Sequence, residues 1–257
     1  MNAEEIKNKL EETAKSKIQV YPVKNLSASR LGHPCERYLY LLLTHWEDLK
    51  PHDVGLQHIF DLGNSIEDYV IKQLKEAGFE VVTPTERSWK IDVKNGFISG
   101  REDLRIKDEK GELLPVEVKG LSPYDFDKLN TIEDFFKSKK AHIKGYPAQL
   151  FIYMYKFEKQ RGFFVICNKQ SGEIKPIEVN MDYEFGEACL SKAERIYDAI
   201  DMYTESASIE TPKLEELALI ESVKEYTALS VLKALKLESF DKYHVNDLAI
   251  EYATEKF

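Results

Sequence analysis

The segment from Phe97 to Gly120 brings two carboxylates and an amine together. Its two apolar-alternating runs flank the turn-forming sequence KDEKGE, and this pattern predicts an antiparallel hairpin. A turn centred on the EK of that sequence places Asp103 opposite Glu117. Side chains alternate between the two faces of a strand, so Lys119 then lies on the same side as Glu117. Three charged groups are therefore expected to converge.

Two facing carboxylates repel each other. Opposed residues in an antiparallel pair have Cβ atoms about 4.5–5.5 Å apart, so Asp103 and Glu117 destabilise the hairpin unless a cation neutralises them. Alternatively, both are solvated strand positions and Lys119 forms a surface ion pair. The apolar sequences FISG and LLPV precede the two acids and predict buried strands, in which unpaired charges are rare. A divalent metal site is the favoured interpretation.

Composition indicates a water-soluble protein with a sizeable core. The chain has 257 residues, of which 43% are hydrophobic, enough for one large domain or a domain with a helical appendage. The charged start MNAEEIKNKLEE lacks a signal-peptide core, and no apolar run approaches a membrane span, so we expect a cytoplasmic protein without membrane contact. Three widely spaced cysteines, Cys35, Cys167 and Cys189, argue against a disulfide framework or a C-x-x-C zinc site.

Charge is distributed unevenly along the chain. The net charge is −9, and residues 182–257 hold 17 acidic and 8 basic residues, so the first 181 residues are neutral overall. Within them, residues 137–169 hold eight basic residues and one acid. This basic stripe is a candidate surface for a nucleic-acid backbone. A solvated helix face is the alternative interpretation.

Hydrophobic periodicity predicts alternating helices and strands. The expected helices are 3–17, 34–46, 54–78, 141–157 and 182–206, and the expected strands are 79–82, 87–93, 97–106, 112–120, 161–169 and 173–179. We expect one domain over residues 1–206 and an acidic helical extension over residues 207–257, with a linker near ETPK at 210–213.

The helix over 54–78 contains a glycine with a carboxylate one turn later. Gly63 costs about 1 kcal/mol relative to alanine inside a helix, so a close-packing reason is expected. Glu67 lies four residues on and therefore on the same face. A close approach of this helix to a sheet would bring the Glu67 carboxylate towards that sheet.

Four short motifs follow one another along the chain, each on the expected element. They are G-x-x-x-E at Gly63, G-x-x-D at Gly100, E-x-K at Glu117 and Q-x-x-x-Y at Gln149. In this order they resemble the PD-(D/E)XK nuclease superfamily, and within it the RecB-like exonucleases, including the CRISPR-associated Cas-four-type nucleases and their phage relatives. The resemblance covers residues 26–179. It implies an α/β restriction-endonuclease-like core, a central mixed sheet flanked by helices, with extra N- and C-terminal helices.

The resemblance also implies roles for individual residues. The metal ligands are Glu67, where many RecB-like proteins have histidine, together with Asp103, Glu117 and the backbone carbonyl of Val118. Such oxygen ligands suit Mg²⁺ or Mn²⁺, which activate water for phosphodiester hydrolysis. Lys119 positions the water or offsets charge on the phosphate. The last two catalytic positions, Gln149 and Tyr153, orient the lysine or the nucleic-acid strand.

One departure from the relatives concerns iron. Many of them hold an iron–sulfur cluster with four cysteines, one before the nuclease core and three near the C-terminus. Cys35 corresponds to the first of these, but this chain has three cysteines in total and only Cys189 follows the core. We therefore expect no iron–sulfur cluster.

The expected partner is linear DNA, single- or double-stranded, with a protein partner possible at the acidic C-terminal helices. Candidate nucleic-acid contacts, some also interpretable as helix caps, are Ser27, Ser29, Arg30, Arg37, Arg101 and Lys144. The expected function is a metal-dependent exonuclease of recombination, repair, phage or CRISPR-type DNA processing. The alternatives are a non-cleaving DNA-binding or assembly module on the same fold and a structure-specific endonuclease.

Overall fold

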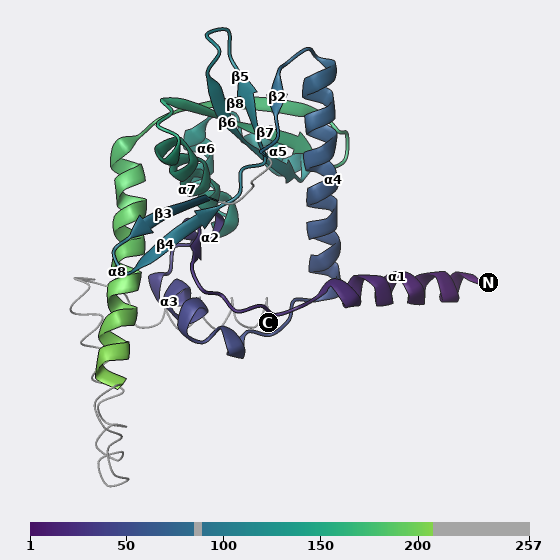
Figure 1. Cartoon of the computed structure of the whole chain (residues 1–257). Coiled ribbons are helices and arrows are strands. Elements are labelled where there is room, and N and C mark those ends of the chain that lie inside the picture. The colour runs from purple at the N-terminus through teal and green to yellow at the C-terminus, as the bar shows by residue number, and fades with distance from the viewer. Residues whose placement is uncertain (85–88, 208–257) are drawn as a thin grey trace. The chain divides into compact units, whose positions relative to one another are not determined.

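The computed structural model describes residues 1–84 and 89–207, without the side chains of 203–207 (Figure 1). Residues 1–49 and 53–200 form one compact unit, and residues 50–52 group with 201–257. The expected acidic helices beyond 207 lie outside the described residues, so the division at 206/207 stays a prediction. Within the described part of the chain, no helix is long and apolar enough to cross a membrane.

A five-stranded sheet forms the centre of the compact unit. Its order is β2-β5-β6-β7-β8, with β6 and β7 parallel and the other neighbours antiparallel. The strands are β2 (Val81–Val82), β5 (Leu104–Lys107), β6 (Leu113–Leu121), β7 (Arg161–Asn168) and β8 (Ile174–Asn180). The predicted α/β class with a central mixed sheet is confirmed.

Helices cover both faces of this sheet (Figure 1). On one face, Ile66 and Val70 of α4 (Val54–Glu76) belong to a buried cluster with Val116 and Val118 of β6. The other face carries α5 (Pro123–Lys128), α6 (Ile132–Lys137) and α7 (Ala141–Lys156), whose apolar side chains pack on β7 and β8. Because successive side chains alternate across a strand, the odd-numbered residues of β6 face α7.

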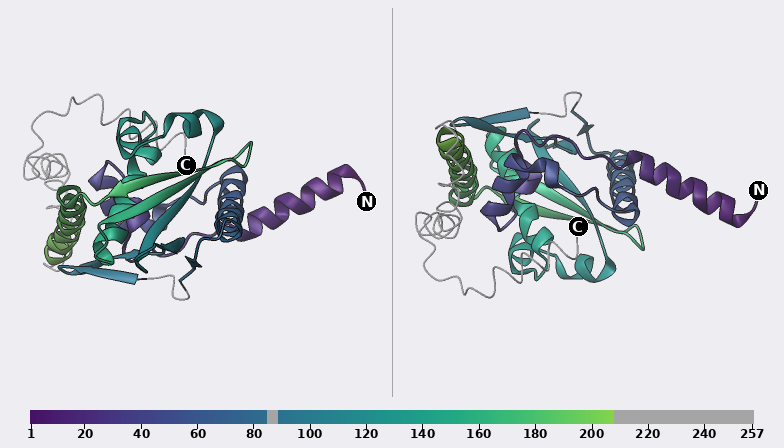
Figure 2. Two further views of the ribbon diagram at one scale, coloured as in Figure 1. Left: turned by 90° about the horizontal axis from the view of Figure 1, so that it is seen from above. Right: turned by 90° about the horizontal axis from the view of Figure 1, so that it is seen from below.

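A smaller sheet supports the site from one side. Its order is β1-β4-β3, from β1 (Leu26–Ser27), β4 (Gly96–Gly100) and β3 (Trp89–Val93). Both views of Figure 2 place α8 (Tyr183–Ala207) beside the β3–β4 hairpin. The Tyr197 hydroxyl of α8 accepts from the Leu26 amide at 3.0 Å and donates to the Phe97 carbonyl at 2.6 Å. Through this hydroxyl, α8 is hydrogen-bonded to both β1 and β4 of the smaller sheet.

The predicted single strand over 97–106 is wrong. The structure has two strands in different sheets, β4 and β5, separated by residues 101–103. The Val118 amide, which a continuous strand would pair with a backbone carbonyl, donates to the Asp103 carboxylate at 2.8 Å instead. A side chain thus takes the place of a backbone hydrogen bond between the strands, and β4 pairs in the other sheet instead.

The remaining helices lie within the first 48 residues of the chain. They are α1 (Ala3–Lys17), α2 (Ala28–Leu31), α3 (Glu36–Thr44) and the 3₁₀ turn η1 (Trp46–Asp48). The predicted helix over 34–46 is thus divided between α3 and η1. Cys35 is exposed and caps α3 with its sulfur, whereas Cys167 and Cys189 are buried.

The close approach of α4 to the sheet uses a different glycine from the one expected. A Cβ on Gly63 would meet nothing within 4 Å, so the predicted packing role of Gly63 is wrong. A Cβ on Gly120 of β6 would lie 2.5 Å from Ile66 Cδ1. The helix therefore touches the sheet at Ile66. Earlier on α4, the side chains of Ile59 and Phe60 are exposed.

Two glycine-to-alanine variants should change stability in opposite directions. Gly63→Ala fills open space in a helix and should raise the free energy of unfolding by about 1 kcal/mol. Gly32→Ala should lower it by about 1–3 kcal/mol, because a Cβ there would lie 2.1 Å from the Gly145 carbonyl oxygen, where α2 crosses α7. Urea unfolding followed by circular dichroism measures both. Equal shifts would contradict the packing described.

Candidate active site

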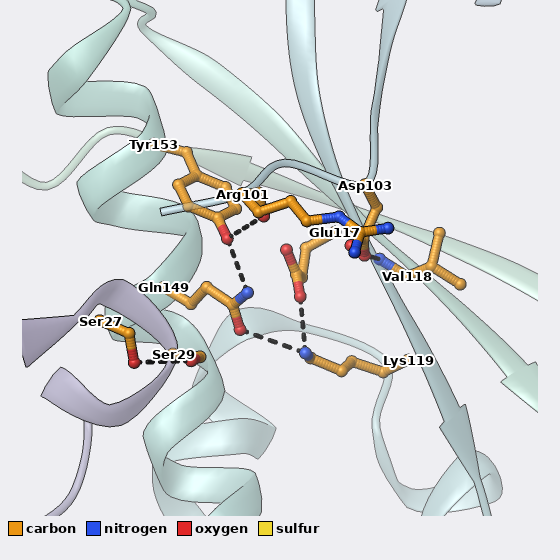
Figure 3. Close-up of polar contacts among 9 residues, drawn as sticks. All are labelled: Ser27, Ser29, Arg101, Asp103, Glu117, Val118, Lys119, Gln149 and Tyr153. Carbon is orange, nitrogen blue, oxygen red and sulfur yellow. Dashed lines mark hydrogen bonds and ion pairs between the residues drawn. The ribbon is translucent and has the colours of Figure 1, made fainter. Parts of the chain in front are cut away.

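The β5–β6 register brings the predicted residues together. Leu104 pairs with Val116, so the next position along places Asp103 opposite Glu117, as the sequence predicts. Glu117 and Lys119 both lie on the face of β6 that α7 covers (Figure 3). The hairpin is therefore the structural origin of the site.

A continuous chain of hydrogen bonds joins β6 to α7 (Figure 3). The Lys119 ammonium donates to Glu117 Oε1 at 2.6 Å and to Gln149 Oε1 at 3.1 Å. The Gln149 amide donates to the Tyr153 hydroxyl at 2.7 Å, and this hydroxyl donates to the Arg101 carbonyl at 2.6 Å. The expectation that Gln149 and Tyr153 share one helix face is confirmed. Their contact fixes the lysine from the helix side.

Glu117 is the most constrained charge in the site. It is 1% exposed, and its Oε2 is a buried oxygen without a hydrogen-bond partner in the described part of the chain. The pKa of Glu117 is raised to about 8, chiefly by burial; the charges of Asp103 and Glu67 add to the rise, and Lys119 opposes it. This carboxyl therefore takes up a proton far more readily than an ordinary glutamate, and its Oε2 is available to a cation.

Lys119 keeps its charge in spite of burial. Desolvation lowers the pKa of the ammonium, but the nearby carboxylates Glu117 and Asp103 outweigh it, and the net shift is upward. The Tyr146 ring lies beside the same nitrogen, with 4.7 Å between Nζ and the ring centroid. A charged amine is thus held at a fixed place between a strand and a helix.

Glu67 reaches the site from α4. Its side chain is 15% exposed, and its Oε1 lies 3.9 Å from Nη2 of Arg101. Among residues 1–84 and 89–207, no group of three or more His, Cys, Asp and Glu side chains is arranged to hold a metal ion. The ligand set Glu67, Asp103, Glu117 and Val118 therefore stays a prediction.

The candidate nucleic-acid contacts lie on several elements. Ser27 and Ser29 lie at the start of α2 with their hydroxyl oxygens 3.1 Å apart, beside the part of α7 that carries Gln149 (Figure 3). Ser27 precedes α2 but makes no side-chain capping bond, so the capping interpretation fails for it. The four basic candidates are exposed: Arg30, Arg37, Arg101 and Lys144.

The basic stripe of the sequence is not one surface. Lys140, at the start of α7, pairs with Asp125 at 2.8 Å, and Arg161, beyond its other end, pairs with Asp108 at 2.6 Å. A helix rises about 1.5 Å per residue, so the 16 residues of α7 separate the two groups by about 24 Å. The basic residues are close together in the sequence but do not form one surface, because the middle of α7, between the two groups, is buried.

Two further side chains belong to the site and carried no motif. Glu102 is 1% exposed and accepts two hydrogen bonds from Arg105, at 2.5 and 2.9 Å. The Arg105 guanidinium lies over the Phe157 ring, 4.0 Å from its centroid. This clamp holds the turn that carries Asp103. Strand alternation gave no signal for this pair, because it places residues three apart on opposite faces, whereas residues 101–103 lie between β4 and β5.

The aromatic residues of α7 have separate roles. Aromatic side chains can stack on nucleic-acid bases, and Tyr146, Phe151 and Tyr155 are three candidates on this helix. Tyr146 contacts Lys119, whereas Phe151 is buried against Phe185 at 5.0 Å between ring centroids. Tyr155 is exposed. Phe151 is therefore a core residue and is excluded as a stacking surface.

The buried Glu117 predicts a pH dependence of stability in the presence of EDTA. Its folded-state pKa of about 8 lies above the ordinary value of 4.5, so the folded protein holds one proton more than the unfolded chain between these pH values. The free energy of unfolding should therefore fall as the pH rises through this window, by at most about 1.4 kcal/mol per pH unit. Glu117→Gln should flatten the slope in urea titrations at pH 5–8. The same slope in both proteins would contradict the assignment.

Comparison with solved structures identifies the fold. The chain superposes on an alkaline exonuclease (LHK-Exo) from Laribacter hongkongensis at 12% identity, covering 78% of this chain and 95% of that chain with a TM-score of 0.50. For the same exonuclease in complex with dAMP, the identity is 14%, the match covers 72% of this chain and 92% of that chain, and the TM-score is 0.49. For a phage-related exonuclease from Haemophilus somnus 129PT, the identity is 16%, the match covers 72% of this chain and 97% of that chain, and the TM-score is 0.45. No protein-family model and no curated protein matches the chain.

The chain therefore shares the α/β fold of this alkaline exonuclease, consistent with the nuclease-like core that the resemblance implied. Its place in the RecB-like branch stays a prediction. One fold supports many functions, so activity has to be argued from the site.

Proposed function

We propose that this chain is a metal-dependent nuclease that hydrolyses phosphodiester bonds of linear DNA, most simply as an exonuclease of the RecB-like branch. The observation that carries the proposal is the ion pair of the buried Glu117 and the partly buried Lys119 on the central strand, beside Asp103, in a fold shared with an alkaline exonuclease. A charged amine held between a carboxyl and an amide is costly to bury, and such arrangements are typical of catalytic sites.

The donor set fits a hard divalent cation. Glu117 Oε2 on β6, which has no hydrogen-bond partner among the described residues, and the Asp103 carboxylate just before β5 are both oxygen donors. The N–H and C=O of one strand residue point to the same side, so the Val118 carbonyl faces the side of Asp103, beyond the end of β5. Bound Mg²⁺ or Mn²⁺ would lower the pKa of a water and stabilise the leaving oxygen. Glu67 would complete the set from α4.

The remaining residues bind and orient. Lys119 donates towards the scissile phosphate or its attacking water, and Gln149 keeps the lysine in place. Tyr153 fixes the Arg101 carbonyl and so the turn that carries Asp103. Ser27 and Ser29, beside α7, and the exposed arginines would bind backbone phosphates, which position a strand without reading its sequence.

The test is degradation of an end-labelled linear duplex with Mg²⁺ or Mn²⁺. We expect mononucleotides or short products, none in EDTA, and an intact covalently closed circle of the same sequence. Cleavage of the circle would favour a structure-specific endonuclease. DNA binding without cleavage of either substrate in either metal would favour a non-cleaving module on the same fold, and would contradict the proposal.

A further inference from the structure

Arg101 has a fixed backbone and a movable side chain. Its carbonyl accepts the Tyr153 hydroxyl at 2.6 Å, and Tyr153 also contacts Gln149, so the main chain is tied to the network that holds Lys119. The side chain is 54% exposed and extends from this point past Asp103 (Figure 3). Its guanidinium can therefore move while its origin stays in the site.

In this structure the guanidinium pairs with Glu67, with 3.9 Å between Nη2 and Oε1. The charges of Glu67 and Asp103 both act on Glu117, so the three acids lie near one another and repel. A guanidinium among them supplies the positive charge that reduces this repulsion. The long distance and high exposure indicate a weak ion pair, which a stronger partner can displace.

Arginine has two suitable partners here. A carboxylate binds it, and so does a phosphodiester, because the planar guanidinium matches two oxygens of either group. We propose that Arg101 alternates between Glu67 and a backbone phosphate of the nucleic acid, so that substrate binding releases Glu67. The inference depends on the proposed function for the identity of the substrate. A cation bound at Glu67 likewise frees Arg101 and strengthens DNA binding. Because the coupling is reciprocal, bound DNA strengthens cation binding by the same factor.

A double-mutant cycle in EDTA tests this exchange without cleavage. Affinity for a fluorescein-labelled duplex is measured for the wild type, Glu67→Gln, Arg101→Met and the double variant. Glu67→Gln should raise affinity about fivefold by freeing Arg101, and by less than twofold when Arg101 is already methionine. The loss of one negative charge acts equally in both backgrounds and cancels in the cycle. Arg101→Met should also reduce the salt slope by about one ion.

A second ion pair provides the control. Arg195 and Glu36 also form an exposed pair, at 2.6 Å, between α8 and α3. Glu36→Gln and Arg195→Met should have additive effects on DNA affinity. Arg101 is largely exposed, so its variant should fold, and circular dichroism checks this.

The outcomes separate the two proposals. Additive effects of Glu67→Gln and Arg101→Met would overturn the exchange, even if the wild type degrades linear DNA with Mg²⁺. A wild type that binds no duplex in EDTA at low salt would overturn it as well. Coupling of the expected size, with no cleavage in any metal, would support the exchange and overturn only the nuclease activity.

Discussion

Lys119→Met is expected to reduce the rate of DNA cleavage about a thousandfold while changing DNA affinity less than about threefold. The ammonium is held between Glu117 and Gln149, where it can stabilise charge that develops on the phosphate. Removing one such preorganised group typically costs 10²–10³ in rate. The fold should tolerate the change, because the raised pKa of Glu117 already favours the neutral carboxyl, which needs no cationic partner. Single-turnover cleavage measures the rate, and fluorescence anisotropy measures affinity.

Lys94→Met is the matched control for that experiment. Lys94 is exposed and pairs with Asp198, outside the network of β6 and α7. The Lys94→Met variant should cleave DNA at the wild-type rate. If Lys119→Met cleaves within threefold of the wild type, Lys119 has no catalytic role.

Asp103→Asn is expected to weaken Mn²⁺ binding about a hundredfold and to abolish measurable cleavage. Asparagine can still accept the hydrogen bond from the Val118 amide through its oxygen, so the turn is kept while the ligand charge is lost. The variant should be at least as stable as the wild type in EDTA, because repulsion with Glu117 disappears. Calorimetric titration with Mn²⁺ and thermal unfolding in EDTA measure the two effects.

The control for this variant is Asp92→Asn. Asp92 is an exposed acid on β3 and should bind Mn²⁺ like the wild type. Loss of stability in Asp103→Asn, with unchanged Mn²⁺ affinity, would make Asp103 a structural residue.

Local patterns predicted the parts of the site that depend on one element or one hairpin. Strand alternation and turn chemistry placed Asp103 opposite Glu117, and helical spacing placed Gln149 beside Tyr153. The α/β class followed from the order of helices and strands. These inferences held because each depends on backbone geometry over a few residues.

Inferences about contacts between distant elements were less successful. Gly63 was predicted to lie where α4 approaches the sheet, but α4 contacts β6 through Ile66, at Gly120. The spacing of apolar residues shows which face of a helix is buried, but not which turn of the helix meets the sheet. The strand break after Gly100 arises from the Asp103 carboxylate, whose bond to Val118 no propensity encodes. The clamp of Glu102 and Arg105 on Phe157 was missed because it depends on where α7 ends in space.

The most direct measurement is a crystal structure of the protein soaked in Mn²⁺, with the ion located by its anomalous scattering. We expect an ion bound by the carboxylates of Glu67, Asp103 and Glu117 and the carbonyl of Val118, with the Lys119 ammonium beside it and Arg101 turned away from Glu67. An enzyme that cuts DNA with its Mn²⁺ bound elsewhere, or with these oxygens still turned away from the ion, would contradict the account.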